Sequence, residues 1–200
     1  MSKENSQKIT EKINAVSQEL KELALSLHSR PELSFHEFFA CETLTKILEK
    51  YGYQVQKGAA GLETAFIGEK RGREGGPTVA ILAEYDALPM GHACGHNLIA
   101  AMSVGAAIGI GEVIGDLCGR VLVIGTPAEE GGGGKVILCD HGIFKDVDFA
   151  MMIHPAKRNM VQRGGLAVKQ VKIEYFGQPA HGTRPEEGIS ALSAVIQTFN

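Results

Sequence analysis

The chain has 200 residues, of which 44% are hydrophobic and 22% are charged, and its formal net charge is −3. That length predicts one or two domains, and that composition is typical of a globular protein able to bury a core. The weakly acidic balance argues against nucleic acid or an anionic membrane as a partner, because both bind basic surfaces.

The sequence predicts a cytoplasmic protein. No apolar run reaches the roughly 18 residues of a membrane span, and the N-terminal lysines are not followed by the apolar core of a secretory signal. In that compartment the four cysteines, at positions 41, 94, 118 and 139, are expected to be free thiols or metal ligands rather than two disulfides.

Helical and strand patterns alternate along most of the chain. Apolar residues at three- and four-residue spacing predict helices over 6–28 and 37–51. The other predicted elements are strands near 53–56 and 64–67, an exposed loop over 68–77, a strand over 78–86, a helix over 97–115 capped by Asn97, a strand over 120–130, a helix over 135–139 and a strand over 146–155. The last three strands are continuous apolar runs, which indicate burial on both faces. The predicted fold is therefore α/β, with a mostly parallel sheet flanked by helices.

The pattern changes after Gly164. Residues 166–177 alternate apolar and polar side chains, which predicts a strand with one solvated face, and 185–200 predict the start of a helix. We therefore place a domain boundary near residue 165. The segment 166–200 is too short to bury a core alone, so it is expected either to pack on the first unit or to belong to a longer chain.

Acidic or imidazole side chains lie at the end of each of the three long predicted strands. They are Glu84 and Asp86, Glu129 and Glu130, and His154. Ligands of open α/β sheets bind beyond the carboxyl ends of the strands, so one sheet edge is expected to gather these groups. His154 alone would be interpreted as a structural histidine, but its place beside the other two strand ends favours a role in the site.

The densest cluster is EYDALPMGHACGHN, residues 84–97, which adds His92, Cys94 and His96 to the two acidic residues. Thiolate, imidazole and carboxylate are the ligands of zinc-like ions, and Cys94 and His96 stand two residues apart, so both can face one site. Either residue alone would fit a polar turn with a buried thiol. The whole cluster at a strand end favours a metal site.

The pair Glu129–Glu130 lies in TPAEEGGGG, residues 126–134. The ordinary interpretation is a solvated pair. After a buried strand, one carboxylate can instead bind a metal ion, which lowers the pKa of its bound water to about 7. The other carboxylate can then take a proton from that water and pass it to the leaving amine. The run GGGGK also resembles a phosphate-binding loop, but Val136 stands where Ser or Thr should follow Lys135, so nucleotide binding is a weak alternative.

His181 and Arg184 lie in PAHGTRPEEG, residues 179–188, on a predicted loop of the second unit. They fit either a solvated surface or a substrate contact, in which the guanidinium of Arg184 would bind a carboxylate.

Six segments, taken in order, resemble the metallopeptidase-like amidohydrolases, a family that includes aminoacylases, carboxypeptidase G, indole-acetyl-amino-acid hydrolases and p-aminobenzoyl-glutamate hydrolases. The segments are HSRPELSFHE, AEYDALP, GHACGHN, GTPAEEGGGG, DVDFAMMIHP and FGQPAHGTRPEEGISAL. The resemblance is to the peptidase-like branch that carries EYDALP and GHACGHN, and it runs from about residue 20 to Asn200.

The resemblance implies a role for most of these side chains. Cys94 would be the thiolate that bridges two metal ions, with His96, Glu130 and His154 as further ligands. Glu129 would be the general base, and Asp86 would orient His96. His181 would bind the substrate or the tetrahedral intermediate from a lid domain, often across a dimer.

The resemblance also implies hydrolysis of an amide bond in N-acyl amino acids or small dipeptides. One or two divalent ions are expected, zinc first, with manganese or cobalt as alternatives. Residues 1–165 would be the N-terminal part of the catalytic domain, and 166–200 the beginning of a lid that forms a homodimer.

The sequence departs from this family in two ways. Glu84 stands where related branches have Asp, and no later histidine supplies the last ligand expected in a chain of about 400 residues. The alternative is therefore a truncated or inactive fragment that binds only metal or a partner.

Overall fold

The computed structural model describes residues 2–161, 164, 167, 169 and 171–200. The chain divides into two compact units, Met1–Lys157 and Arg158–Asn200, here called unit 1 and unit 2. The assignment of 1–165 to a catalytic domain and 166–200 to a lid stays a prediction.

Unit 1 contains a five-stranded sheet with the order β1-β2-β4-β3-β5. The strands are β1 (Gln54–Lys57), β2 (Phe66–Arg71), β3 (Arg73–Ala83), β4 (Cys118–Gly125) and β5 (Phe149–Met151). β3 pairs in parallel with β4 and β5, whereas β2 pairs antiparallel with β1 and β4. The predicted α/β class is confirmed. The sheet is mixed, and its parallel part is the group of strands whose ends carry the predicted site.

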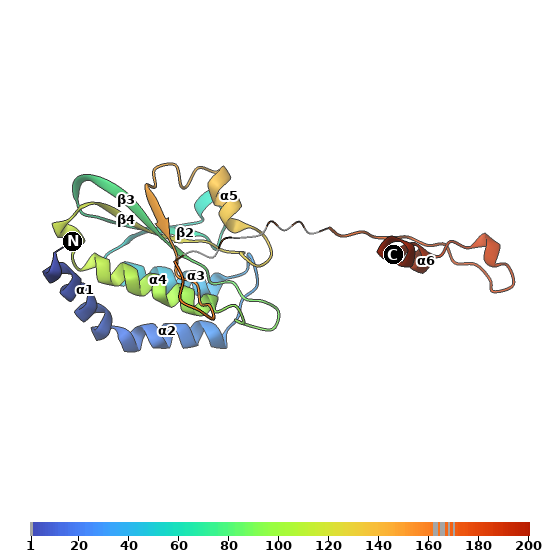
Figure 1. Cartoon of the computed structure of the whole chain (residues 1–200), viewed down its shortest axis with the longest axis horizontal. Coiled ribbons are helices and arrows are strands. Elements are labelled where there is room, and N and C mark those ends of the chain that lie inside the picture. Colours follow the sequence, from blue (N-terminus) through green and yellow to red (C-terminus); the bar gives the residue numbers. More distant parts are fainter. Residues whose placement is uncertain (1, 162–163, 165–166, 168, 170) are drawn as a thin grey trace. The chain divides into compact units, whose positions relative to one another are not determined.

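Helices cover both faces of the sheet. They are α1 (Lys3–Ala15), α2 (Ser17–Ser29), α3 (Phe38–Lys50), α4 (His96–Gly111) and α5 (Gly134–Asp140). α1 to α4 lie on one face and α5 lies on the other (Figure 1). Side chains of β4 alternate accordingly: Val121 and Val123 enter the core with α2, α3 and α4, while Leu122 and Ile124 enter the core with Leu138 of α5.

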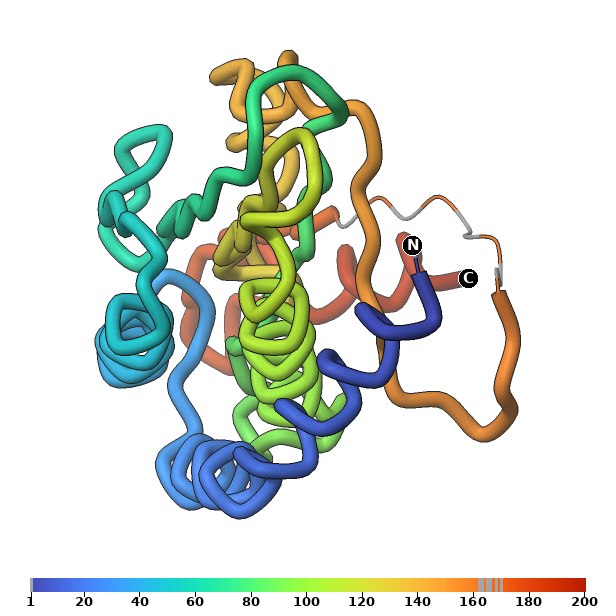
Figure 2. The backbone as a smooth tube through the Cα atoms, turned by 90° about the vertical axis from the view of Figure 1, so that its left-hand side faces the viewer, coloured from blue at the N-terminus to red at the C-terminus, as the bar shows by residue number. Residues whose placement is uncertain are grey.

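Helix α4 is apolar on all sides because it lies between the sheet and the helices α1, α2 and α3. Its small residues permit this packing: a Cβ added at Gly105 would lie 2.8 Å from Leu20, and one at Gly109 would lie 2.9 Å from Ile13. Figure 2 shows α2, α3 and α4 nearly end-on. The predicted cap at Asn97 is wrong, because Asn97 donates from Nδ2 to the carbonyl oxygen of Ala24 at 3.0 Å, inside the packed face.

Three predicted elements of unit 1 differ in the structure. The single helix over 6–28 is broken at Val16 into α1 and α2. The predicted loop over 68–77 instead contains the end of β2 and the start of β3. These strand ends are largely exposed to water, which explains their polar residues. The predicted buried strand over 146–155 is only Phe149–Met151, and all three of its residues are exposed. It is an edge strand of the sheet and pairs with β3.

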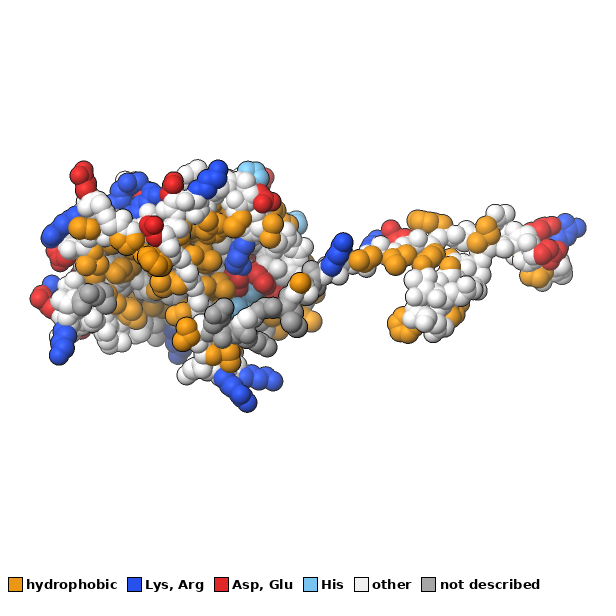
Figure 3. Space-filling view, turned by 45° about the horizontal axis from the view of Figure 1, so that its top comes forward, with side chains coloured by type: hydrophobic (Ala, Val, Ile, Leu, Met, Phe, Trp, Pro, Cys, Tyr) orange, Lys and Arg blue, Asp and Glu red, His pale blue; other side chains and the backbone are white. Residues whose placement is uncertain are grey.

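Hydrophobic side chains are exposed on the face of unit 1 that carries β5 and α5 (Figure 3). Phe149 is 62% exposed, Met151 56% and Val136 63%. Within the described ranges, no helix is long and apolar enough to cross a membrane. All four cysteines are free, as predicted.

Unit 2 contains a short 3-10 helix, η3 (Pro185–Glu187), and the helix α6 (Ala191–Phe199). Ser190 caps α6, since its Oγ accepts from the N–H of Ser193 at 3.1 Å. The helix predicted over 185–200 therefore begins later than expected. Of the strand predicted over 166–177, residues 166, 168 and 170 lie outside the described residues, and 171–177 form no strand.

The chain crosses from one side of β4 to the other at Gly72, whose N–H donates to the carbonyl oxygen of Gly119 at 2.8 Å. A Cβ at this position would collide with the carbonyl oxygens of Ile114 and Leu117. We expect Gly72→Ala to lower the free energy of unfolding by about 2–3 kcal/mol. Gly115→Ala is the matched control, because a Cβ there meets nothing within 4 Å. Urea unfolding measures both, and equal stability of the two variants would contradict this account of the crossing.

Candidate metal centre

The three parallel strands end at the same edge of the sheet, and the predicted site residues follow them. Glu84 and Asp86 come after β3, Glu129 and Glu130 after β4, and His154 after β5. His96 is the first residue of α4, placed there by the turn at Gly95, whose φ of 81° is a conformation that favours glycine. The edge of one sheet and the start of one helix thus build the site.

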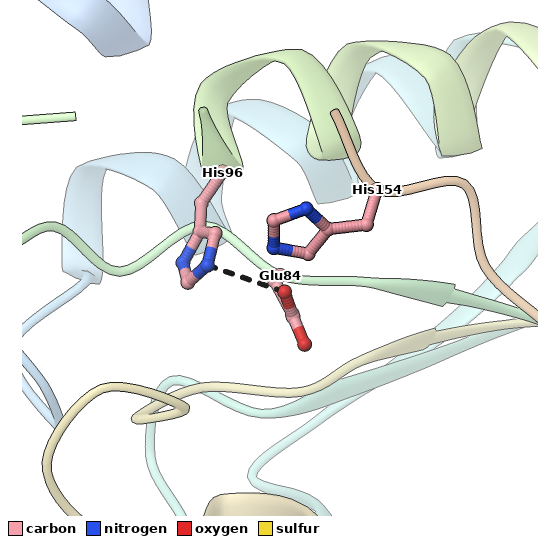
Figure 4. Close-up of side chains that lie close together, drawn as sticks. All are labelled: Glu84, His96 and His154. Atoms are coloured by element: carbon pink, nitrogen blue, oxygen red, sulfur yellow. Dashed lines mark ion pairs between the residues drawn. The ribbon is translucent and has the colours of Figure 1, made fainter. Parts of the chain in front are cut away.

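His96 is the centre of this arrangement. Its Nε2 lies 3.3 Å from Glu84 Oε2, 3.8 Å from Glu130 Oε1 and 3.9 Å from Glu129 Oε2. Its ring meets that of His154 edge-on, with 5.8 Å between centroids. Among the residues that the structure describes, two groups of three side chains could each hold a metal ion, because the ligand atoms within each group lie within 4.8 Å of one another. One group is Glu84, His96 and His154 (Figure 4), and the other is His96, Glu129 and Glu130.

Asp86 orients His96. The Nδ1 of His96 lies 3.0 Å from Asp86 Oδ1 and 2.9 Å from the Asp86 carbonyl oxygen. Both of these atoms are acceptors, so Nδ1 carries the proton and Nε2 faces the site. The other oxygen, Oδ2, accepts from the Ser34 hydroxyl at 3.0 Å and the Glu130 N–H at 2.9 Å. Burial opposes ionisation, but the hydrogen bonds with His96 and Glu130 hold the pKa of Asp86 below its usual range.

Two buried atoms of the site lack hydrogen-bond partners in the described part of the chain, Glu84 Oε2 and His96 Nε2. Burial lowers the pKa of His96, but the hydrogen bond to Asp86 and the charges of Glu84 and Asp86 raise it above its ordinary value. Buried polar atoms are normally satisfied, and a carboxylate oxygen facing an imidazole nitrogen is a donor set for a divalent ion. The residues present therefore fit a metal ion.

Cys94 is in neither of these two groups of ligand atoms. The neighbouring carboxylate of Glu130, then burial and the charge of Glu129, raise the pKa of Cys94 to about 11. Burial and then the charge of Glu84 also raise the pKa of Glu129. The same negative surroundings that keep the thiol protonated attract a cation, and a coordinated thiol loses its proton.

Glu37 holds the loop after β4 and was not predicted as a site residue. It is fully buried, and it accepts from the N–H of Ala128 at 2.8 Å and from the hydroxyl of Thr64 at 2.8 Å. Ala128 has a φ of 57°, a backbone conformation that non-glycine residues rarely adopt. Glu37 thus fixes the residue just before Glu129. The signal in the sequence was an acidic side chain in the segment HSRPELSFHE with no basic residue close after it.

Lys135 also was not predicted as part of the site. It lies in the first turn of α5 and forms an ion pair with Glu84. A lysine at a helix N-terminus opposes the helix dipole, and this misplaced charge was the signal for a specific acidic partner. The group that would bind phosphate in a GGGGK loop is therefore engaged by a carboxylate. Gly134 is required there, since a Cβ would collide with the Pro127 carbonyl oxygen.

His181 and Arg184 lie in unit 2 and are exposed. The Nδ1 of His181 lies 2.8 Å from the Thr183 hydroxyl, and Arg184 donates to Glu187 at 3.1 Å. Their predicted contact with substrate stays a prediction.

The fold and the site define an α/β protein with a candidate metal centre at the carboxyl edge of its parallel strands. Residues 80–200 match the profile of peptidase family M20/M25/M40, and the chain belongs to this family. The resemblance to metal-dependent amidohydrolases is thereby confirmed.

Relatives and a solved structure agree with this assignment. The chain is 38% identical to the Xaa-Arg dipeptidase of Mus musculus and 34% identical to one of the subunits of p-aminobenzoyl-glutamate hydrolase from Escherichia coli, in each case over 94% of its length. It spans 47% and 43% of those two proteins, which is less than half of each. The chain also resembles the solved structure of the YXEP protein of Bacillus subtilis, which is described as a dinuclear metal-binding peptidase of the M20 family. The match covers 68% of this chain and 42% of the YXEP chain, with a TM-score of 0.64 and 31% sequence identity.

Removing the Glu37 carboxylate is expected to destabilise the loop after β4. Glu37→Ala leaves a buried N–H and a buried hydroxyl without their acceptor, so we expect a loss of about 2–4 kcal/mol in the free energy of unfolding. Glu37→Gln keeps the acceptor for Ala128 and is the matched control.

These variants also have a distinct pH dependence. Burial raises the pKa of Glu37, so its ionisation costs stability as the pH rises through that pKa. The wild type should therefore lose stability relative to Glu37→Gln between about pH 4 and about pH 7. Urea unfolding at both pH values measures the difference in the free energy of unfolding between the two proteins. If the wild type gained stability relative to Glu37→Gln as the pH rises, the raised pKa of Glu37 would be refuted.

Proposed function

We propose that the protein is a metal-dependent hydrolase that cleaves an amide bond in N-acyl amino acids or small dipeptides. The observation that carries the proposal is the pair of unsatisfied buried atoms, Glu84 Oε2 and His96 Nε2, beside Glu129 and Glu130. Membership of family M20/M25/M40 and the names of the relatives support the reaction class.

We propose that Cys94, His96, Glu130 and His154 hold the metal. Thiolate, imidazole and carboxylate donors suit zinc first, with manganese or cobalt as alternatives. When bound, a divalent ion would supply Lewis-acid activation of water and of the scissile carbonyl. The two groups of ligand atoms that share His96 support one or two ions.

In this mechanism Asp86 keeps His96 in one tautomer by accepting the proton of Nδ1 in a hydrogen bond. Glu129 accepts a proton from the attacking water on its carboxylate and donates it to the nitrogen of the leaving amine as the amide C–N bond breaks. The side chain of Glu129 is 44% exposed, so a substrate can approach it, whereas Asp86 is buried and serves only to position.

We also propose that His181 and Arg184 contact the substrate, and that unit 2 forms a homodimer. An exposed guanidinium can bind the free carboxylate of an amino-acid or dipeptide substrate with two hydrogen bonds. The cytoplasmic location expected from the sequence stays a prediction.

Glu129→Gln tests the proton transfer. We expect kcat on N-acyl amino acids and dipeptides to fall by about 10²–10⁴-fold, because a positioned acid–base group contributes that much. The metal content, measured by inductively coupled plasma mass spectrometry, should not change. Glu63→Gln is the control, since Glu63 is exposed and makes the same change of charge. Full turnover by Glu129→Gln would remove Glu129 from its role, and metal binding by the wild type without turnover would favour a metal-binding or partner-binding module.

Arg184→Gln tests the substrate contact. We expect KM to rise about 10-fold for substrates with a free carboxylate, because a charged hydrogen bond is lost, and not for the corresponding amides. Arg158→Gln, which alters another exposed arginine of unit 2, should leave KM unchanged. An equal rise in KM for both kinds of substrate would contradict recognition of the carboxylate.

A further inference from the structure

Glu84 has a place in the site that the resemblance did not assign to it. It is 2% exposed, and its two oxygens face different partners. Oε1 forms the ion pair with Lys135, and Oε2 faces His96 Nε2 at 3.3 Å with no hydrogen bond between them. Figure 4 shows the carboxylate and the rings of His96 and His154 turned toward a common space.

The hydrogen-bond pattern of His96 explains why this contact calls for a cation. Nδ1 has only acceptors as partners, so it carries a proton, and in the neutral form of the ring Nε2 presents a lone pair. In that form the lone pair faces the lone pairs of Glu84 Oε2 inside a buried space. A positive ion between the two atoms would turn this repulsion into two bonds, and His154 lies within reach of the same point.

Lys135 supplies a positive charge to the same carboxylate from the other side. Its side chain is 30% exposed, whereas that of Glu84 is 3% exposed. The flexible side chain of Lys135 can therefore move its ammonium group into water, whereas the carboxylate of Glu84 is held in the buried site. An ammonium and a metal ion on one carboxylate repel each other, so each weakens the binding of the other.

We propose that Glu84 is a direct ligand of the metal ion, together with His96 and His154, and that Lys135 competes with the metal for Glu84. The inference rests on the metal binding proposed above. It assigns a new ligand to the site and makes Lys135 a residue that limits its affinity.

The competing explanation is that Glu84 serves only to anchor Lys135 and the start of α5. The two explanations predict different signs for two substitutions. If Glu84 is a ligand, Glu84→Gln weakens metal binding and Lys135→Met strengthens it. If Glu84 is only an anchor, both substitutions break the same ion pair and act in the same direction.

The experiment measures the affinity of the 200-residue chain for Zn²⁺ by competition with a chromophoric chelator. We expect Glu84→Gln to weaken binding by at least about tenfold, since even changes beside a ligand commonly cost that much. Lys135→Met should tighten binding by about threefold to tenfold, because a nearby positive charge is removed. Glu63→Gln and Lys145→Met are exposed controls with the same changes of charge, and both should match the wild type.

Circular dichroism without metal shows which variants are folded. If Glu84→Gln does not fold, Lys135→Met decides alone: tighter binding supports the proposal, and unchanged or weaker binding overturns it. Wild-type affinity in a folded Glu84→Gln, or a loss of affinity in both variants, also overturns it. A wild-type chain that binds no Zn²⁺ would refute this inference and the proposed metal site together, whereas the other failures leave the proposed hydrolase intact.

Discussion

The carboxylate of Asp86 joins the separate segments from which the site is built. One oxygen fixes the ring of His96 at the start of α4, and the other accepts from Ser34 and from the backbone of Glu130. Helix α4, the loop before α3 and the loop after β4 are distant in sequence. They meet at one side chain that is 1% exposed and shielded from competing water. The arrangement of His96 and Glu130 therefore depends on a single buried acid.

A second buried acid, Glu37, has a similar role at the backbone level. It stabilises the left-handed conformation of Ala128, which turns the chain so that Glu129 and Glu130 follow β4 toward the site. Such strained residues persist where neighbouring contacts over-determine them, and they are common at functional sites. The two glutamates are thus placed by backbone contacts, which leaves their carboxylates free for chemistry.

The sequence was sufficient to predict the class of the fold and the gathering of Glu84, Glu129 and His154 at one edge of the sheet. Continuous apolar runs before Glu84, Glu129 and His154 indicated strands. Because open α/β sheets bind ligands beyond the carboxyl ends of their strands, these three residues were expected at one edge of the sheet. The sequence signalled that Glu37 and Lys135 each need a partner, but the identity of that partner was not predictable, because each contact joins segments far apart in the chain. Likewise, the apolar run around Phe149 predicted burial, but local pattern does not tell a central strand from an edge strand.

The two histidines of the site are prepared to different degrees. His96 is 1% exposed and its ring is fixed by a carboxylate, whereas His154 is exposed and its Nδ1 lies 2.8 Å from the carbonyl oxygen of its neighbour Pro155. His154 also follows β5, the strand whose apolar side chains are exposed. A ligand that must be ordered on binding reduces the affinity that its bond supplies. In the proposed centre, His96 is therefore the more constrained ligand, with the buried oxygen of Glu84 beside it, and the exposed His154 is the ligand whose side chain would lose more freedom on metal binding.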